Sequence, residues 1–251
     1  MSITAHQTLL EIVDKSHLHA QVLNWFGIAF YDKPDQTLKQ ICAQRGLELD
    51  RVIRHLEFSQ MPKGDNCPVT LCDYPVHLVI AYLKQSHRRF IRERLPYMGE
   101  LIRNIKVECF DDTSVAEDLK FVFPLFLEDF IKHIFEEEKS QFGYILRLQR
   151  AAKGRFSLLR TYYDLEKNAI QEFIDHHHEE DDEMSGIRSL TNDYQITAST
   201  GTYTKVIYSE LQAFEQELQI HANIEDNILF PKALKLENKV KKLVERKAKW
   251  N

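Results

Sequence analysis

Two His-x-x-x-Glu motifs contain the side chains of this 251-residue chain that are best suited to bind a metal ion. The first consists of His133 and Glu137, and the second of His221 and Glu225. Residues four apart on an α-helix lie on one face, one turn apart, so each motif can direct an imidazole and a carboxylate at the same point. The motifs therefore predict metal ligands on two different helices.

The surroundings of the two motifs are similar, which indicates a weak internal repeat. Phe142 follows the first histidine by nine residues, and Phe230 follows the second by the same number. Two related helix pairs, arranged about a pseudo-two-fold axis, would account for this repeat.

Both motifs lie on apolar faces of their predicted helices. Phe126 and Phe130 share a face with His133, and Leu218 shares one with His221. A carboxylate buried on such a face costs several kcal/mol unless another group compensates its charge. A single motif of this kind is usually a surface ion pair. Two copies in matching apolar positions favour a metal ion as the compensating group.

One further histidine lies on the first long helix. His87 interrupts an apolar stripe that includes Ile80, Leu83 and Ile91. Such a histidine is either a ligand or a hydrogen-bonded residue of the core, and the stripe alone does not separate the two.

The third long helix carries three consecutive histidines followed by acidic residues. His177 has the helical phase of the apolar Ile170, so it is the predicted ligand. His176 has the phase of Glu183, and both are expected to face solvent. His178 is the reserve candidate.

The resulting donor set suits a pair of metal ions. Two bridging carboxylates with two histidines per ion favour iron or manganese over a structural zinc, which prefers a closed four-coordinate site. So few protein ligands leave positions open for water, an oxo bridge, O₂ or NO. We expect two Fe ions, oxo- and carboxylate-bridged, with Mn and Zn as alternatives. The predicted metal ligands are His87, His133, Glu137, His177, His221 and Glu225.

The composition predicts that long helices position these ligands. Glycine (8) and proline (7) are scarce, and the apolar spacing after residue 72 is close to 3.6. We place helices near 74–107, 115–151, 158–193 and 202–237, which is the four-helix arrangement in which bundles commonly hold dinuclear sites. Ser114 and Glu117 are a candidate capping box, and Pro124 predicts a late start or a kink.

The chain before residue 72 predicts a separate small module. Residues 1–58 read as four short helices, 59–71 as a linker, and 72–251 as an all-α four-helix bundle with a basic C-terminal tail. Gly27 is expected to end the second short helix. Thr37 and Gly46 are expected to begin and end the third.

Several classes of function are disfavoured. The net charge is −5 without a basic tract, so nucleic acid is not an expected partner. We find no signal peptide and no membrane-spanning stretch, and the four cysteines are expected to be free thiols. These features favour a cytoplasmic protein that does not bind a membrane.

The motif segments resemble the RIC (repair of iron centres) family, whose members are also called YtfE or ScdA, over nearly the whole chain. HRRFIRERLP is similar to the family's first-helix segment, and HIFEE to its second-helix His-x-x-x-Glu. Counting back ten residues from Ile187 to the family's third-helix histidine selects His177. HANIEDNILFPKAL is similar to the fourth-helix segment and is the most specific match.

This resemblance implies a hemerythrin-like di-iron bundle with an N-terminal ScdA-type helical domain. The four histidines of the proposed set would be terminal ligands, and the two glutamates would bridge the ions. Two functions follow as hypotheses. The first is iron–sulfur cluster repair or NO and O₂ handling in nitrosative and oxidative stress, with iron–sulfur client proteins as partners. The second is reversible O₂ or NO binding or sensing without repair. A homodimer is compatible with both.

The chain departs from the family pattern in its first long helix. The family ligand lies seven residues before the Leu of Leu-Pro, which is Arg88 here, whereas His87 lies eight before it. His77 and Tyr82 are nearby alternatives. The ligand on this helix is therefore the one least fixed by the resemblance.

A second departure lies in the N-terminal module. The family carries adjacent Cys-Cys-Gly-Gly where this chain has Tyr31, Asp32, Lys33 and Pro34. A thiol pair can transfer metal or take part in redox chemistry, and these side chains cannot exchange disulfides. Any family function that depends on those thiols is in question here, and enzymatic activity is left open.

Overall fold

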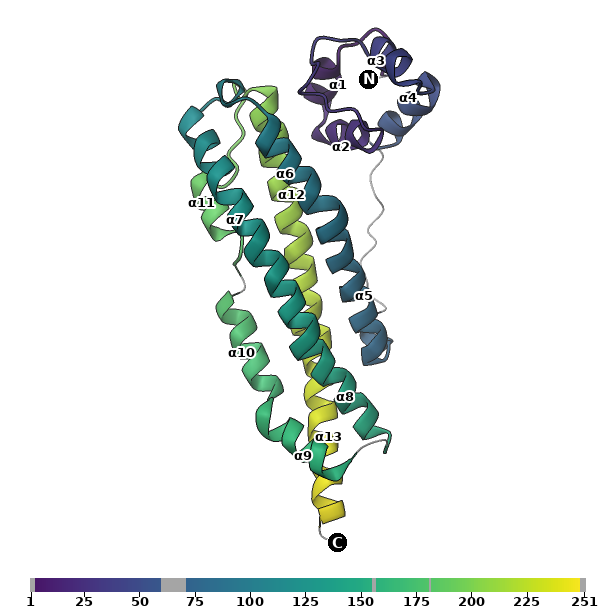
Figure 1. Cartoon of the computed structure of the whole chain (residues 1–251), viewed down its shortest axis with the longest axis vertical. Helices are drawn as coiled ribbons and strands as arrows, with labels where there is room; N and C mark the ends of the chain where they lie inside the picture. The colour runs from purple at the N-terminus through teal and green to yellow at the C-terminus, as the bar shows by residue number, and fades with distance from the viewer. Residues whose placement is uncertain (1–2, 60–70, 155–156, 181, 249–251) are drawn as a thin grey trace. The chain divides into compact units, whose positions relative to one another are not determined.

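The computed structural model describes residues 3–59, 71–154, 157–180 and 182–248, and it is built from α-helices (Figure 1). Within these ranges the only β pairing is an isolated antiparallel bridge between Thr8 and Thr37. The prediction of an all-α fold is confirmed. No helix in the described ranges is both long enough and apolar enough to cross a bilayer.

The chain divides into two compact units. Unit 1 contains residues 1–67, 94–124 and 186–214, and unit 2 contains residues 68–93, 125–185 and 215–251. The predicted linker at 59–71 lies outside the described residues except for its first and last positions. The proposed boundaries at 58 and 72 therefore stay predictions.

Unit 1 begins with four short helices, and their ends follow from local sequence. The side chain of Thr37 accepts a hydrogen bond from the Gln40 amide, so the predicted cap is confirmed. Gly27 (φ 72°) and Gly46 (φ 64°) follow the second and third helices in the left-handed region, as predicted. The four helices are α1 (Leu9–Lys15), α2 (His17–Trp25), α3 (Leu38–Arg45) and α4 (Leu49–Phe58).

A buried ion pair joins separate segments within unit 1. Arg94 precedes α6 (Leu95–Asn104), and its guanidinium donates to Glu210 Oε2 over 3.0 Å. Glu210 lies on α12 (Thr202–Ile224), and its Oε2 also accepts a hydrogen bond from Gln21 Nε2 on α2 at 2.5 Å. Both charged side chains are buried, so each compensates the other's loss of hydration.

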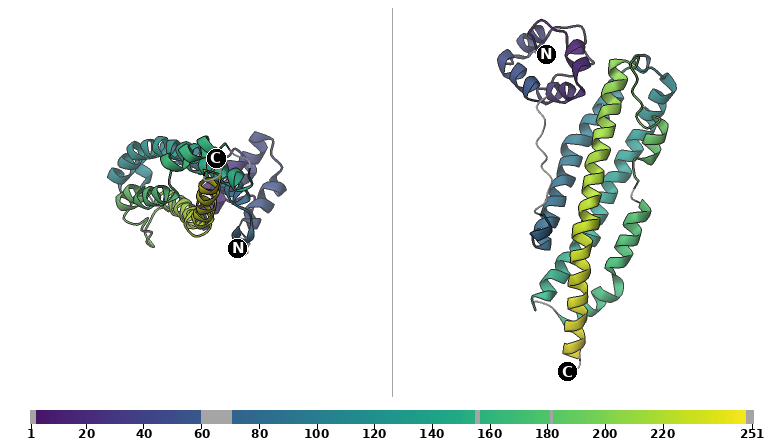
Figure 2. Two further views of the ribbon diagram at one scale, coloured as in Figure 1. Left: turned by 90° about the horizontal axis from the view of Figure 1, so that it is seen from below. Right: turned by 180° about the vertical axis from the view of Figure 1, so that it is seen from behind.

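Unit 2 consists of four helical segments that lie side by side, and α13 contacts α8, α9 and α10 (Figure 2). Its apolar core includes Leu83, Phe142, Ile145, Ile170 and Leu229. The segments are α5 (Val76–Arg89), α7 (Thr113–Glu137) with α8 (Gly143–Ala152), α9 (Leu158–Lys167) with α10 (Ile170–Glu180), and α12 with α13 (Phe230–Ala248). α7 and α12 contribute residues to both units.

A buried carboxylate ties three of these segments together. Glu237 Oε1 on α13 accepts hydrogen bonds from the Tyr144 hydroxyl at 3.0 Å and from the Ile170 amide at 3.1 Å. Its Oε2 pairs with Lys241 Nζ at 2.9 Å. Glu237 therefore fixes α13 against α8 and the first turn of α10.

Two of the four long helices differ from the prediction in instructive ways. The segment predicted at 158–193 is interrupted, because Asn168 adopts an extended conformation and its side chain bonds back to the Asp164 carbonyl at 2.9 Å. The cap of α7 is Asp112, whose Oδ1 accepts from the Ser114 amide at 2.9 Å, so the proposed Ser114–Glu117 capping box is wrong. α7 starts at Thr113 and continues through Pro124.

Three π-helical turns interrupt the long helices of the described chain. The first, η2 (Phe90–Arg94), separates α5 from α6, which together replace the predicted helix at 74–107. The second, η4 (Glu138–Phe142), separates α7 from α8. The third, η5 (Glu225–Leu229), separates α12 from α13, which extends the last helix beyond its predicted end at 237.

The ion pair in unit 1 gives a stability prediction. Arg94→Met removes one partner and leaves the Glu210 carboxylate buried without its countercharge, which should lower the free energy of unfolding by about 3 kcal/mol. Urea unfolding of the full chain, followed by circular dichroism, measures the change. Arg92→Met is the matched control, because Arg92 is exposed two residues away and should change stability by less than about 0.5 kcal/mol. Equal effects of the two substitutions would contradict a stabilising role for the pair.

Candidate metal centre

The predicted ligands all lie in unit 2, and four of them form one buried cluster. His87, Glu137, His221 and Glu225 each offer a ligand atom, and these atoms lie within 4.8 Å of one another. They come from α5, α7, α12 and η5, which bring together residues up to 138 positions apart in the sequence. All four side chains are buried, so the cluster is an interior feature of the unit.

The nitrogen and oxygen atoms of the cluster converge closely. His87 Nε2 lies 2.9 Å from His221 Nε2 and 3.3 Å from Glu137 Oε2. His221 Nε2 lies 3.4 Å from Glu225 Oε1. Imidazole nitrogens and carboxylate oxygens that point at one small volume are the donor arrangement of a metal site.

His177 adjoins the cluster from α10. Its Nε2 lies 2.7 Å from Glu225 Oε2, and its ring is buried. Helical phase and the family pattern both selected this histidine from the run of three. The side chains of His176 and His178, the reserve candidate, lie outside the described part of the structure.

His133 is more peripheral than the other five predicted ligands. It lines a pocket of about 30 Å³ together with all of them, but its side chain is 30% exposed. Its Nε2 lies 3.6 Å from Glu183 Oε1. His133 thus reaches the site from the wall of the pocket.

Glu183 is a residue that helical phase misplaced. It was expected to face solvent, but it lines the same pocket as the predicted ligands. Phase counting from His176 fails here because α10 ends at Glu180 and the next helix, α11 (Ser185–Leu190), begins only after a break. The site therefore contains a third carboxylate that the pattern did not reveal.

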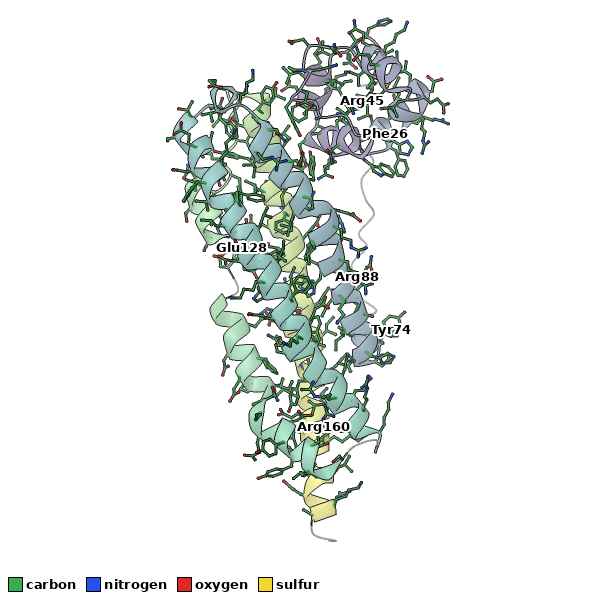
Figure 3. All side chains as sticks on the ribbon, in the orientation of Figure 1. Phe26, Arg45, Tyr74, Arg88, Glu128 and Arg160 are labelled. Carbon is green, nitrogen blue, oxygen red and sulfur yellow. The ribbon has the colours of Figure 1, made fainter. Side chains whose placement is uncertain are left out.

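The first long helix presents His87 rather than its alternatives. Arg88 is exposed on α5 (Figure 3), Tyr82 is exposed, and His77 is exposed with its Nδ1 3.0 Å from Gln149 Nε2. The extra residue between His87 and the Leu-Pro pair coincides with η2. A π-turn accommodates one more residue than an α-turn, so it can absorb this one-residue offset from the family spacing.

The two other π-turns explain why each phenylalanine of the repeat reaches the site. Phe142 is the fifth residue after Glu137, and Phe230 is the fifth after Glu225. In a regular α-helix such residues point about 140° apart. In a π-turn, with its i→i+5 hydrogen bond, they lie on the same face. η4 follows the first glutamate, and η5 starts at the second.

The result is a repeated constellation around two histidines. Glu137 and Phe142 both contact His87, since the carboxylate lies 3.3 Å from Nε2 and the rings stack at 5.7 Å. Glu225 and Phe230 both contact His177, at 2.7 Å and at a ring distance of 5.3 Å. In both cases the glutamate and the phenylalanine that follow a motif histidine contact the histidine of the preceding helical segment.

The acidic residue directly after each glutamate also takes part in the repeat, because it lies near the Nδ1 atom of the same histidine. Glu138 Oε1 lies 3.1 Å from His87 Nδ1 and is itself paired with Lys84 at 2.8 Å through Oε2. Asp226 Oδ1 lies 3.7 Å from His177 Nδ1. A carboxylate at the second ring nitrogen orients a metal-binding histidine and raises its basicity. Sequence reasoning missed this pair, although the Glu-Glu and Glu-Asp doublets were a usable signal.

Burial and neighbouring charges drive the two central carboxyl groups in opposite directions. Burial, together with the charge of Glu225, raises the pKa of Glu137 well above its usual range. Burial alone would also raise the pKa of Glu225. The charge of His221 and hydrogen bonds from His177 and His221 outweigh burial and hold that pKa well below its usual range. Burial and the charge of His221 lower the pKa of His87 to about 4.

The cluster passes a test of fit for metal ions. Glu137 Oε1 is buried and accepts no hydrogen bond from the described residues, and the buried Glu225 Oε1 has His221 Nε2 at 3.4 Å, which is long for a hydrogen bond. Buried carboxylate oxygens are normally hydrogen-bonded, and a bound cation would compensate both of them. Imidazole with carboxylate is a donor set for iron, manganese or zinc.

This reasoning predicts opposite effects of one substitution with and without metal. Glu137→Gln keeps the shape of the side chain and removes a carboxyl group whose ionised form burial disfavours, so the metal-free protein should lose no stability or gain about 1 kcal/mol. The stabilisation by added Fe(II), about 2.7 kcal/mol at a hundred times the dissociation constant, should disappear. Thermal unfolding under anaerobic conditions measures both. Glu136→Gln, on an exposed neighbour, should leave the Fe(II) effect intact. Retention of that effect in Glu137→Gln would remove this residue from the ligand set.

The chain is similar in sequence to known cation-binding proteins. Residues 78–233 match the model of the hemerythrin HHE cation binding domain family. The iron-sulfur cluster repair protein ScdA of Staphylococcus haemolyticus is 20% identical over 92% of this chain and 99% of its own length. The iron-sulfur cluster repair proteins YtfE of Musicola paradisiaca (24% identical, 84% of this chain, 89% of the relative) and of Escherichia coli O81 (26%, 79% and 83%) are similar. Because the family model covers more than half of the sequence, this chain belongs to the hemerythrin HHE cation binding family.

Proposed function

We propose that this chain holds two iron ions at the cluster and acts in iron–sulfur cluster repair. The observation that carries the proposal is the repeated constellation, in which each of two buried glutamates contacts the histidine of a neighbouring helical segment. The proposed terminal ligands are the four histidines, and the proposed bridges are the two glutamates. The ligand set is His87, His133, Glu137, His177, His221 and Glu225.

The dimensions of the site limit what can reach the metal. A pocket of about 30 Å³ holds little more than one water molecule, so a diatomic ligand fits and an organic substrate does not. Phe90, Phe130 and Leu218 supply apolar wall. Iron would supply open coordination positions and a change of oxidation state. The protein residues would hold the ions, orient the imidazoles and limit the access of water.

The repair role itself comes from the relatives. Proteins named for iron–sulfur cluster repair align with most of this chain, and for the first of them the match extends over 99% of its length. On this basis we infer that the client molecules are iron–sulfur proteins, that the setting is nitrosative or oxidative stress, and that the compartment is the cytoplasm.

Metal analysis tests the iron centre. The protein purified from cells supplied with iron should contain about two Fe per chain. The variant His133→Ala/Glu137→Gln should lose most of this iron, because it lacks one proposed terminal ligand, His133, and one proposed bridging ligand, Glu137. His77→Ala/Glu136→Gln is the matched control, since it changes the same residue types at exposed positions of the same unit. Full iron content in the first double variant would overturn the ligand assignment. Stoichiometric zinc or manganese in place of iron would overturn the choice of metal.

A second candidate function is reversible binding or sensing of O₂ or NO. The support for this function is in the N-terminal module. There this chain has Tyr31 and Asp32 at the positions where the RIC family, which the chain resembles, has two adjacent cysteines. Burial raises the pKa of Tyr31, so this side chain stays a neutral phenol at physiological pH. Neither residue can exchange a disulfide or transfer metal as a thiolate does.

Two measurements on the reduced iron-loaded protein separate the candidates. For repair, the protein should restore activity to an iron–sulfur enzyme whose cluster has been damaged by NO, and the His133→Ala/Glu137→Gln variant should not. For sensing, O₂ or NO should give an optical adduct that reverses on removal of the gas, with no restoration of the damaged enzyme. The second result would replace repair by sensing as the assigned function.

A further inference from the structure

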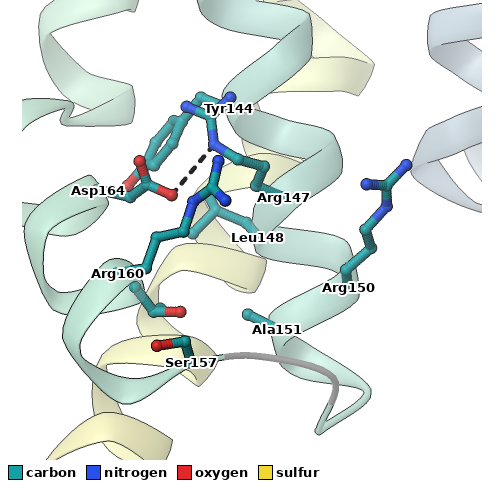
Figure 4. Close-up of a pocket in the computed structure, with 9 residues that line it drawn as sticks. Tyr144, Arg147, Leu148, Arg150, Ala151, Ser157, Arg160 and Asp164 are labelled. Carbon is teal, nitrogen blue, oxygen red and sulfur yellow. Dashed lines mark hydrogen bonds and ion pairs between the residues drawn. The ribbon is translucent and has the colours of Figure 1, made fainter.

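A second pocket, unrelated to the metal centre, lies in unit 2 between α8 and α9 (Figure 4). Its volume is about 290 Å³, roughly ten times that of the pocket at the metal centre, and it lies at the lower end of the range for small-molecule sites. Tyr144, Leu148 and Ala151 line it and are buried, so they form an apolar floor. The pocket therefore has room for a small organic molecule.

The charged residues of this pocket are mostly arginines. Arg147, Arg150 and Arg160 line it together with one carboxylate, Asp164, so the lining carries three positive charges and one negative charge. This local excess is notable in a chain whose net charge is −5. Clustered guanidinium groups recognise phosphate and carboxylate groups through paired N–H donors.

One arginine is held in place before any ligand arrives. Arg147 Nε donates to Asp164 Oδ2 over 3.1 Å, and its guanidinium carbon lies 5.8 Å from the centre of the Tyr144 ring. The Tyr144 hydroxyl is already bonded to Glu237, so the ring cannot easily turn away. A donor that is fixed in advance loses little conformational entropy on binding.

The other two arginines differ in direction. Figure 4 shows the guanidinium group of Arg160 pointing toward that of Arg147, whereas Arg150 points away from both. Asp164 alone cannot balance two converging guanidinium groups. An added anion between Arg147 and Arg160 would complete the balance.

Hydroxyl groups lie at the same pocket. Ser157 and Thr161 line it, and Ser157 precedes the first residue of the ten-residue helix α9. The Ser157 side chain makes no capping hydrogen bond to that helix. Figure 4 shows Ser157 at the opposite end of the pocket from the guanidinium groups of Arg147 and Arg160, so its hydroxyl lies where the organic part of a bound anion would extend.

We propose that this pocket binds the phosphate group of a small phosphorylated molecule. Arg147 and Arg160 bind the phosphate oxygens, and the apolar floor contacts the organic part of the ligand. The site does not depend on the metal centre or on the function proposed for it.

Isothermal titration calorimetry of the iron-loaded protein with phenyl phosphate and with inorganic phosphate tests this site. Phenyl phosphate should bind at least about threefold more tightly, because the floor buries its ring. Arg160→Gln should weaken phenyl phosphate binding about tenfold or more, and Arg160→Lys should weaken it less. Arg150→Gln is the matched control from the same rim and should weaken it less than about threefold. The iron absorbance should not change during the titration, which separates this site from phosphate binding at the metal.

Three results would overturn the proposal. The first is no binding of phenyl phosphate at millimolar concentration. The second is equal weakening by Arg160→Gln and Arg150→Gln, which would indicate general attraction of anions. The third is binding to phosphatidylglycerol vesicles that depends on Arg160 without binding of phenyl phosphate, which would assign the residue to a lipid headgroup. Arg160 is exposed, so its substitution should leave the fold intact, and circular dichroism verifies this.

Discussion

The fold of unit 2 depends on one costly interaction, the burial of two carboxylates in one small volume. Glu137 and Glu225 are both almost fully buried, and each bears on the pKa of the other. Their desolvation would destabilise the unit by several kcal/mol without compensation. Histidines from four helical segments line the pocket around them, and a pair of cations would compensate the remaining negative charge. The long helices can be understood as the framework that holds these charges together.

The π-turns give the helices the local geometry that brings the glutamates and phenylalanines to the same histidines. An α-helix alone would place Glu137 and Phe142 on different faces, yet both contact His87. The same problem and the same solution recur at Glu225 and Phe230 with His177. A π-turn is less stable than an α-turn, so its repetition at corresponding positions indicates that the site, rather than helix propensity, determines the local geometry.

These features decide how far the sequence could predict the structure. Helical phase alone selected His177, because α10 is a regular helix through that residue and its apolar side is clear. Phase failed for Glu183, which follows a break, and it could not reveal the π-turns, whose extra residue leaves no mark in an apolar pattern. The cap at Asp112 was missed because this residue, two positions before Ser114, competes well for the first amides of the helix. The arginine pocket was also missed, since its residues come from two short helices with no motif between them.

The N-terminal module bears on how such a site could take part in repair. The described cysteines do not replace the absent thiol pair: Cys42 is buried, which raises its pKa, while Cys72 and Cys109 lie apart from it in the sequence and are free thiols. A buried thiol with a raised pKa is a poor nucleophile, and a single exposed thiol cannot close a disulfide within the chain. Among the described residues there is therefore no thiol pair that could supply sulfur or electrons for repair. His133 on α7 and Glu183, between α10 and α11, are the most exposed polar residues of the pocket wall, so the site is least shielded from solvent at these two side chains.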